Sequence, residues 1–206
     1  MSNKNEPDSS GGLEFCSPLD NPEMKYSLAI ECASGGDTGR AEKLFLEIIK
    51  GNPKHYGARI GLGAVYMEQG RLDESIKENE TATQINPDHP TAFVNLAAAF
   101  IQKGDFDTAI NECEEALFID PRNADAYKNL SWAYLEKGDY DRSIFVAGKL
   151  LEFEPHSGLA YNNIAVALYY KEDYAKSMDY VKKALREGFP VHPDFYNDLR
   201  ERMDKE

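Results

Sequence analysis

The sequence predicts an all-α protein, a right-handed α-solenoid of tandem helical hairpins. Four Asn-Pro, Asp-Pro or Glu-Pro pairs recur at one interval of 34 residues, with their prolines at 53, 87, 121 and 155. Glycines recur on the same period between these pairs, and small residues recur at two further positions. A strict period of this length is typical of stacked repeats, in which each unit buries its apolar face against its neighbours.

Composition and charge narrow the kinds of partner. The chain has 206 residues, of which 42% are hydrophobic, and a formal net charge of −13. This charge repels phosphate backbones and anionic lipids, so we expect no nucleic acid and no membrane partner, and favour protein or peptide segments that are apolar or basic. Apolar runs such as Leu96–Ile101 are far shorter than the roughly 20 residues of a membrane span. Cys32 and Cys113 show no CxxC spacing, so we expect a soluble protein of the reducing cytoplasm.

Residues 1–21 differ from the rest of the chain. They are polar, rich in Ser, Gly, Asn and Pro, and lack the basic start and apolar core of a secretory signal. We expect a disordered N-terminal tail here. Cys16 ends the motif LEFC, which is similar to a lipidation box, but no apolar segment precedes it, so we interpret it as a free cysteine.

Five units follow without an insertion, at 22–55, 56–89, 90–123, 124–157 and 158–191. The seventh residue of each unit is Leu or Ile. The eighth is small: Ala29, Gly63, Ala97, Ser131 and Ala165. The fifteenth is glycine in the first four units, and glycine supplies the left-handed conformation that ends a helix. Proline at position 32 then stops a second helix, so each unit is predicted to be a helical hairpin.

These positions resemble the tetratricopeptide repeat, whose signature combines a large residue at position 4, Leu at 7, Gly or Ala at 8, Tyr at 11, Ala at 20, an aromatic residue at 24, Ala at 27 and Pro at 32. The resemblance covers about five sixths of the chain. The departures are Lys25 in the first unit, Arg59 and Asn79 in the second, and Glu172 in place of the fifth turn glycine. The resemblance implies a non-catalytic scaffold whose first helices line a concave groove for peptides or partner helices.

Residues 192–206 are predicted to form a C-terminal capping helix. This helix would start near Pro193 and place Phe195, Leu199 and Met203 four residues apart on one face. Such an apolar stripe can cover the exposed edge of the last unit.

The resemblance also implies which residues face the groove. Positions 2, 5, 6, 9, 12 and 13 of each first helix lie opposite its core side, and Trp132, the only tryptophan, is at position 9. We expect Trp132 to project into the groove; the alternative is that a neighbouring first helix packs against it. The other predicted partner-binding residues outside position 6 are Val94, Ala98, Ile101, Lys128, Leu135, Asn162, Val166 and Tyr169. A groove lined in this way is mostly apolar, which usually marks a contact surface.

Asn95, Asn129 and Asn163 occupy position 6 in three successive first helices. An amide side chain carries a donor and an acceptor in one plane, so it can pair with both backbone groups of an extended peptide. We therefore predict that these three residues bind a peptide independently of its sequence. The alternative is that Asn is simply frequent at this position in the family.

A clamp for an acidic C-terminal tail is not expected. The clamps of this family combine Lys and Asn in one unit with Asn in the next and a basic pair in the third. Here Lys128 and Asn163 match parts of that pattern, but no basic pair follows. Groove acids outnumber Lys128: Glu23, Glu68, Asp125 and Glu136.

No catalytic, cofactor or metal site is predicted. The run SGGDTGR lacks the Lys-Ser/Thr ending of a phosphate loop. His55 and His89 lie one repeat apart, on helices that pack roughly 8 to 10 Å from each other, which is too far for a shared metal. Glu112 and Glu115 are interpreted as part of a solvated helix face.

The leading functional hypothesis is a non-catalytic adaptor that binds an extended peptide or a partner helix in the groove. One alternative is a structural scaffold that self-associates, which leaves a homo-oligomer open. A second alternative is a regulatory or chaperone-like subunit of an enzyme or secretion apparatus.

Overall fold

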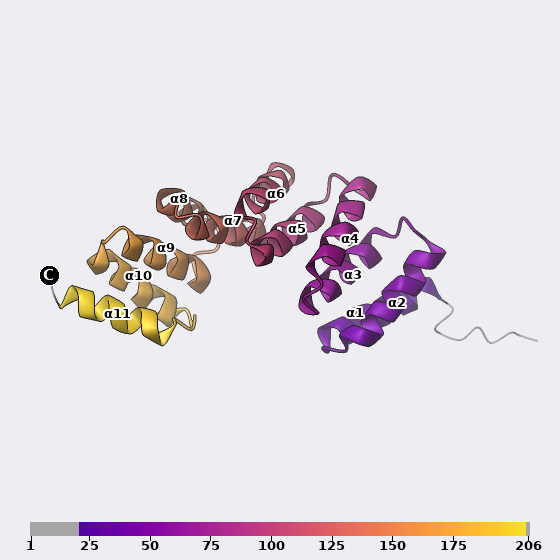
Figure 1. Cartoon of the computed structure of the whole chain (residues 1–206), viewed down its shortest axis with the longest axis horizontal. Helices are drawn as coiled ribbons and strands as arrows, with labels where there is room; N and C mark the ends of the chain where they lie inside the picture. Colours follow the sequence, from indigo (N-terminus) through magenta and orange to yellow (C-terminus); the bar gives the residue numbers. More distant parts are fainter. Residues whose placement is uncertain (1–20, 205–206) are drawn as a thin grey trace, which may run out of the picture.

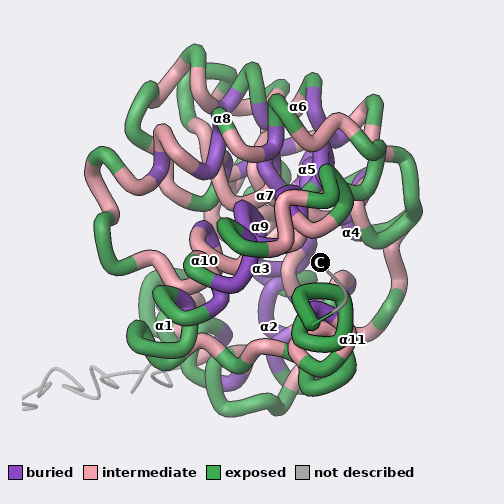
Figure 2. Tube along the Cα trace, turned by 90° about the vertical axis from the view of Figure 1, so that its left-hand side faces the viewer, coloured by how far each residue is buried: buried purple, intermediate pink, exposed green. Residues whose placement is uncertain are grey.

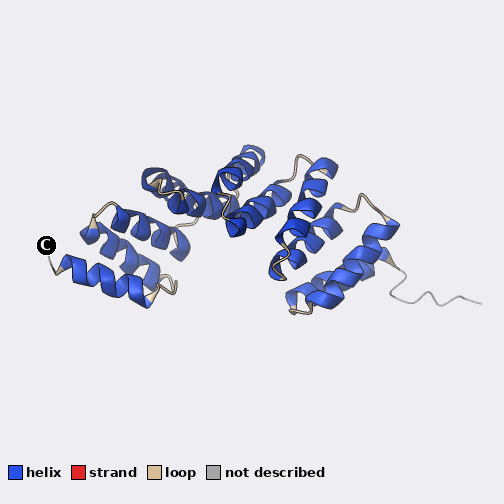
Figure 3. Cartoon of the chain, viewed as in Figure 1, coloured by secondary structure: helices blue, strands red, loops and turns tan. Residues whose placement is uncertain are grey.

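The computed structural model describes residues 21–204, and all regular secondary structure in that range is helical (Figure 3). Ten helices form five hairpins: α1 (Pro22–Ser34) with α2 (Thr38–Gly51), α3 (Tyr56–Glu68) with α4 (Leu72–Ile85), α5 (Pro90–Lys103) with α6 (Phe106–Ile119), α7 (Ala124–Glu136) with α8 (Tyr140–Leu151), and α9 (Gly158–Tyr170) with α10 (Tyr174–Arg186). One further helix, α11 (Pro193–Met203), follows them. The predicted tail, including Cys16, lies outside the described residues except for Asn21.

The hairpins follow one another along an open arch, from α1 at one end to α11 at the other (Figure 1). The first helices of neighbouring hairpins contact each other, α1 with α3, α3 with α5, α5 with α7 and α7 with α9. Each second helix contacts its own first helix and the first helix of the next hairpin. The first helices therefore line the inner, concave side of the arch.

Small residues let the two helices of a hairpin approach closely. The eighth residues of the units are buried in every case. The twentieth residues are fully buried as well: Ala41, Ser75, Ala109, Ser143 and Ser177. The Ser143 hydroxyl donates to the backbone carbonyl of Ser131 at 2.8 Å, and Ser177 donates to that of Ala165 at the same distance. Because these two hydroxyls bond to carbonyls of the facing helix, serine can replace alanine here without leaving a buried polar group unpaired.

The turn inside each hairpin adopts the predicted left-handed conformation. Gly36, Gly70, Gly104 and Gly138 have φ of 80°, 74°, 76° and 78°. Glu172, which occupies the same position in the fifth hairpin, has φ of 64°. The turn geometry is therefore kept even where a side chain makes the left-handed region costly.

A ladder of ion pairs links successive hairpins along one edge. Lys103 lies 2.6 Å from Asp73, and Lys137 pairs with Asp107. Lys171 forms the third pair with Asp141. Each pair joins the end of a first helix to the start of the preceding second helix, so the lysines at this edge already have carboxylate partners.

Helix α11 caps the C-terminal end of the arch, as the sequence predicts. Its Leu199 is fully buried, and the ring of Phe195 lies 5.4 Å from that of Tyr169. Phe195 is partly buried and Met203 is 37% exposed, so Leu199 is the only fully buried member of the predicted stripe. Figure 2 shows α11 exposed along most of its length, with the buried segments on the helices that it covers.

Two glycines inside helices differ in the space around them, so alanine substitutions at these positions should have opposite effects on stability. A Cβ at Gly61 in α3 would lie 2.3 Å from the ring of Phe45, which is fully buried. Gly61→Ala should therefore lower the free energy of unfolding by about 1 to 3 kcal/mol. Gly148 in α8 has no atom within 4 Å of the same position, so Gly148→Ala should raise it by about 0.5 to 1 kcal/mol. Urea unfolding of both variants checks this pair, and equal signs would contradict it.

Glu112 is partly buried on α6, which corrects the expectation of a solvated face. Burial raises the pKa of its carboxyl, and the charges of Glu115 and Glu80 raise it further. The folded chain therefore binds this proton more tightly than the unfolded chain, so the ionised carboxyl destabilises the fold at neutral pH. This penalty is lost as the pH falls below the ordinary glutamate pKa.

Glu112→Gln should therefore raise the urea midpoint at pH 7, and the gain should disappear by about pH 4, near the ordinary glutamate pKa. Urea titrations at several pH values measure this dependence. Glu201→Gln, on the exposed face of α11, is the matched control and should change the midpoint little at either pH. A gain for Glu112→Gln that grows on acidification would contradict the assignment.

Candidate functional site

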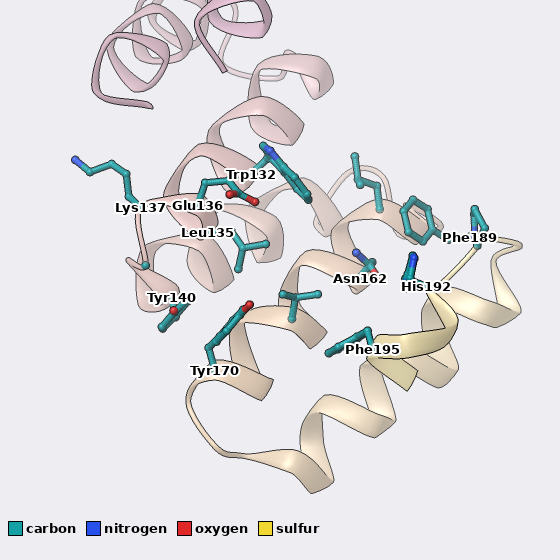
Figure 4. A pocket seen from close by; sticks show the side chains of 14 residues that line it. Trp132, Leu135, Glu136, Lys137, Tyr140, Asn162, Tyr170, Phe189, His192 and Phe195 are labelled. Atoms are coloured by element: carbon teal, nitrogen blue, oxygen red, sulfur yellow. The ribbon is translucent and has the colours of Figure 1, made fainter. Parts of the chain in front are cut away.

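A pocket of about 560 Å³ lies at the C-terminal end of the concave side. Helices α7 and α9, the connection before α11, and α11 itself build it (Figure 4). Its lining residues are Trp132, Leu135, Glu136, Lys137, Gly138, Tyr140, Leu159, Asn162, Val166, Tyr170, Phe189, Pro190, His192 and Phe195. Four predicted partner-binding residues, Trp132, Leu135, Asn162 and Val166, are thus brought together.

Trp132 lies on the pocket wall contributed by α7 and is 38% exposed. Figure 4 shows Trp132 and Tyr170 on one side of the pocket and Phe189, His192 and Phe195 on the other, with Asn162 between them. The indole ring is therefore partly open to solvent rather than enclosed by a neighbouring first helix.

The apolar walls come from both the repeats and the C-terminal connection. Tyr170 is 57% exposed, and its ring stacks on that of Tyr140 at 5.2 Å. On the opposite wall, Phe189 packs against α9 at Gly158, where an added Cβ would lie 2.6 Å from the Cβ of Phe189. Glycine at this position allows the connection to approach α9 closely, and this brings Phe189 to the pocket.

The polar groups of the pocket differ in their partners. Lys137 pairs with Asp107 on the outer edge, and in Figure 4 its side chain points away from the other lining residues. His192 caps α11, because its Nδ1 accepts the backbone N–H of Asp194 at 3.3 Å. Among the described residues, Glu136 has no ion pair, and the amide of Asn162 has no hydrogen-bond partner. The pocket therefore offers one carboxylate and one amide to a ligand.

The three position-6 asparagines bond to the protein itself, and the full burial of Asn163 corrects its predicted role. Asn163 is fully buried, and its Nδ2 donates to the Ser131 hydroxyl at 2.8 Å. Asn95 and Asn129 are partly buried. Their Nδ2 groups donate to Asn79 Oδ1 at 3.2 Å and to the Val94 carbonyl at 3.3 Å. Each amide thus reaches back to the preceding hairpin, because position 6 faces the neighbouring helix pair rather than open groove.

Two further predicted residues are held by other contacts. Lys128 lies 3.0 Å from Asp125 and 3.6 Å from Glu154. Burial acts to lower the pKa of Lys128, but these two carboxylates outweigh it and raise the pKa. The hydroxyl of Tyr169 donates to Asp198 of α11, so Tyr169 holds the capping helix and is not among the lining residues of the pocket.

The remaining predicted residues, Val94, Ala98 and Ile101, lie on α5, one hairpin before Trp132. All three are partly buried. They are not part of the pocket, and Ile101 packs against the buried core shared by α5, α6, α7 and α8.

His55 and His89 each cap the start of a helix. The Nδ1 of His55 accepts the backbone N–H of Ala58 at 3.0 Å, and that of His89 accepts the N–H of Thr91 at 3.4 Å. Within residues 21–204, no three His, Cys, Asp or Glu side chains gather in a way that could hold a metal ion. In the same range, no helix is both long enough and apolar enough to cross a membrane.

Some pocket residues that are not among the predicted partner-binding residues lie on or beside the repeat helices, among them Tyr140, Leu159 and Tyr170. The others, Phe189, Pro190, His192 and Phe195, belong to the segment GFPVHPDF, in which the sequence predicts only the start of a cap. The sequence feature that could have indicated these pocket residues is the high content of Phe and Pro in GFPVHPDF, because a connection between helices does not need aromatic residues.

The two neighbouring asparagines of α9 should differ in their contribution to stability. Asn163→Ala should lower the free energy of unfolding by about 1 to 2 kcal/mol, because it removes a buried hydrogen bond and leaves a small cavity. Asn162→Ala should change stability by less than about 0.5 kcal/mol, because its amide has no partner in the fold. Urea unfolding measures both values, and equal losses would contradict the assigned environments.

Comparison with known proteins places the chain among repeat proteins. A family model described as tetratricopeptide repeat matches residues 34–100 and 100–165, and a second model with the same description matches residues 158–186. No curated protein matches the chain in a sequence search.

Several solved structures have a similar fold. The crystal structure of MamA has a TM-score of 0.70 at 22% identity, covering 84% of this chain and 98% of MamA. YrrB, described as a TPR protein with an unusual peptide-binding site, has a TM-score of 0.66 at 18% identity, covering 90% of this chain and 93% of YrrB. A thermophilic TPR protein from Thermus thermophilus has a TM-score of 0.69 at 17% identity, covering 89% of this chain and 99% of that protein. These identities establish likeness in fold alone.

Proposed function

Because the chain belongs to the tetratricopeptide repeat family, whose members generally mediate protein–protein interactions, we propose that it is a non-catalytic adaptor that holds a segment of a partner protein on its concave side. The observation that carries this proposal is the exposed Trp132 on the wall of the C-terminal pocket. Large aromatic residues at the centre of an interface contribute most of its binding energy. YrrB, which shares the fold, has a peptide-binding site, and this supports the same kind of use here.

The inner surface of the arch suits an extended segment. The apolar side chains that would contact the segment are Val94, Ala98 and Ile101 on α5, Trp132 on α7, and Val166 and Tyr170 on α9. An apolar surface of this length lets a segment bury several side chains in a row. The position-6 asparagines bond to the neighbouring hairpins, so we propose that selectivity rests on the pocket.

The charge of the chain favours neutral or basic partners. The formal net charge is −13. Lys137, which lines the pocket, and Lys128, one turn before Trp132 on α7, are both paired with carboxylates. An acidic segment would find no free cation there, whereas a basic one would be attracted at long range. Since Cys32 and Cys113 are free thiols, we propose that the protein works in the cytoplasm.

Replacing Trp132 should weaken partner binding selectively. Random 12-residue peptides displayed on phage would be selected on the immobilised full chain, and the recovered peptides synthesised with a fluorescent label. Trp132→Ala should raise their Kd by about 30-fold, the effect of losing a central aromatic anchor. Fluorescence anisotropy measures the Kd, and circular dichroism confirms that the variant is folded.

Phe145→Ala is the matched control. Phe145 is 66% exposed on α8, outside the C-terminal pocket, so its removal deletes a similar exposed ring and should leave the Kd within about twofold, as is usual for residues outside the central contact. Unchanged binding to Trp132→Ala would rule out the concave site. Light scattering distinguishes the competing scaffold function, because self-association that persists in Trp132→Ala would favour that alternative.

A further inference from the structure

The C-terminal pocket combines aromatic walls with a single unpaired acid at its edge. Trp132, Tyr170, Phe189 and Phe195 supply apolar surface from three separate parts of the chain. Glu136, one turn after Trp132 on α7, is exposed. These two features favour an apolar group inside the pocket and a positive charge beside it.

The size of the pocket fits a bulky side chain together with its backbone. Its volume of about 560 Å³ lies within the range of pockets that bind small organic groups. The interior polar group is the Asn162 amide, which can pair with a backbone N–H and C=O of an extended segment. The only carboxylate among the described lining residues, Glu136, lies at the edge of the pocket. A cation inside the pocket would lose its hydration without contacting this carboxylate, so the interior favours an apolar group.

The charge of Glu136 is left uncompensated by its neighbours. Lys137 is committed to Asp107, and Lys128 is committed to Asp125 and Glu154. His192 uses its Nδ1 to cap α11. Because each nearby lysine is already paired, a cation that arrives with the partner would be the first to neutralise Glu136.

We propose that the pocket binds a bulky apolar side chain of the partner segment, and that a Lys or Arg within three residues of this anchor pairs with Glu136. This inference rests on the proposed function and specifies its ligand chemistry. The C-terminal connection and α11 are part of the binding site as well as a cap, because Phe189 and Phe195 form the wall that faces Trp132.

A charge-swap experiment tests the pairing. From the peptides selected on the wild-type chain, one is resynthesised with its basic residue nearest the anchor changed to Glu, and another with its apolar anchor changed to Ala. Each is titrated against the wild type and Glu136→Lys by anisotropy at low and high salt. Glu115→Lys, an exposed site on α6 outside the pocket, controls for the change in net charge.

The pairing should appear as a reciprocal preference. The selected peptides should be enriched in Lys or Arg near the anchor. Glu136→Lys should raise the Kd of the basic peptide by about 10-fold. The same variant should bind the Glu-substituted peptide more tightly than the wild type does. High salt should reduce both effects. Glu115→Lys should not reproduce this reversal, and the Ala-substituted peptide should bind weakly to every variant.

Two outcomes overturn the inference while leaving the proposed function intact. One is Trp132-dependent binding without basic enrichment and without an effect of Glu136→Lys. The other is Trp132-dependent binding that tolerates loss of the apolar anchor. Binding that does not depend on Trp132 would instead reject the proposed function itself.

Discussion

The close approach of the two helices in each hairpin is the constraint on which the rest of the structure depends. Fully buried Ala, Ser or Gly residues on both helices allow it, and the serines turn their hydroxyls onto facing carbonyls such as that of Ser131. With the helices this close, the larger seventh residues fill the space between hairpins. The first helices of neighbouring hairpins then contact each other along the inner side of the arch.

The same stacking explains why the asparagines serve the fold. Position 6 lies where one first helix meets the preceding hairpin, so Asn95 and Asn163 find partners in Asn79 and Ser131 before any ligand is present. Asn162, one residue earlier than Asn163, has no such partner and lines the pocket. A shift of one residue along a helix is a rotation of about 100°, which separates a structural amide from one that is free to bind.

The sequence predicts the fold well because the repeat period, the turn glycines and the prolines act locally. Gly104, for example, ends its helix with positive φ in the way its position in the unit indicates. The candidate site is only partly predictable, since it joins the periodic helices to a segment outside the period. Position 9 identifies Trp132, but nothing periodic indicates that Phe189 and Phe195 face it. The predicted orientation of the Asn163 side chain, toward the groove, is wrong. The angle of a residue around its helix does not say which neighbouring helix lies nearest to it.

The place of the pocket at the end of the array has a thermodynamic consequence. Terminal elements of a repeat array have a neighbour on one side only, so they open locally more often than central ones. Helix α11 is held by Leu199 and by the bond from Tyr169 to Asp198, and it carries Phe195 into the wall of the pocket. A partner that binds only the docked arrangement is linked to this local equilibrium, so the measured affinity includes the docked fraction of the last helix as a factor.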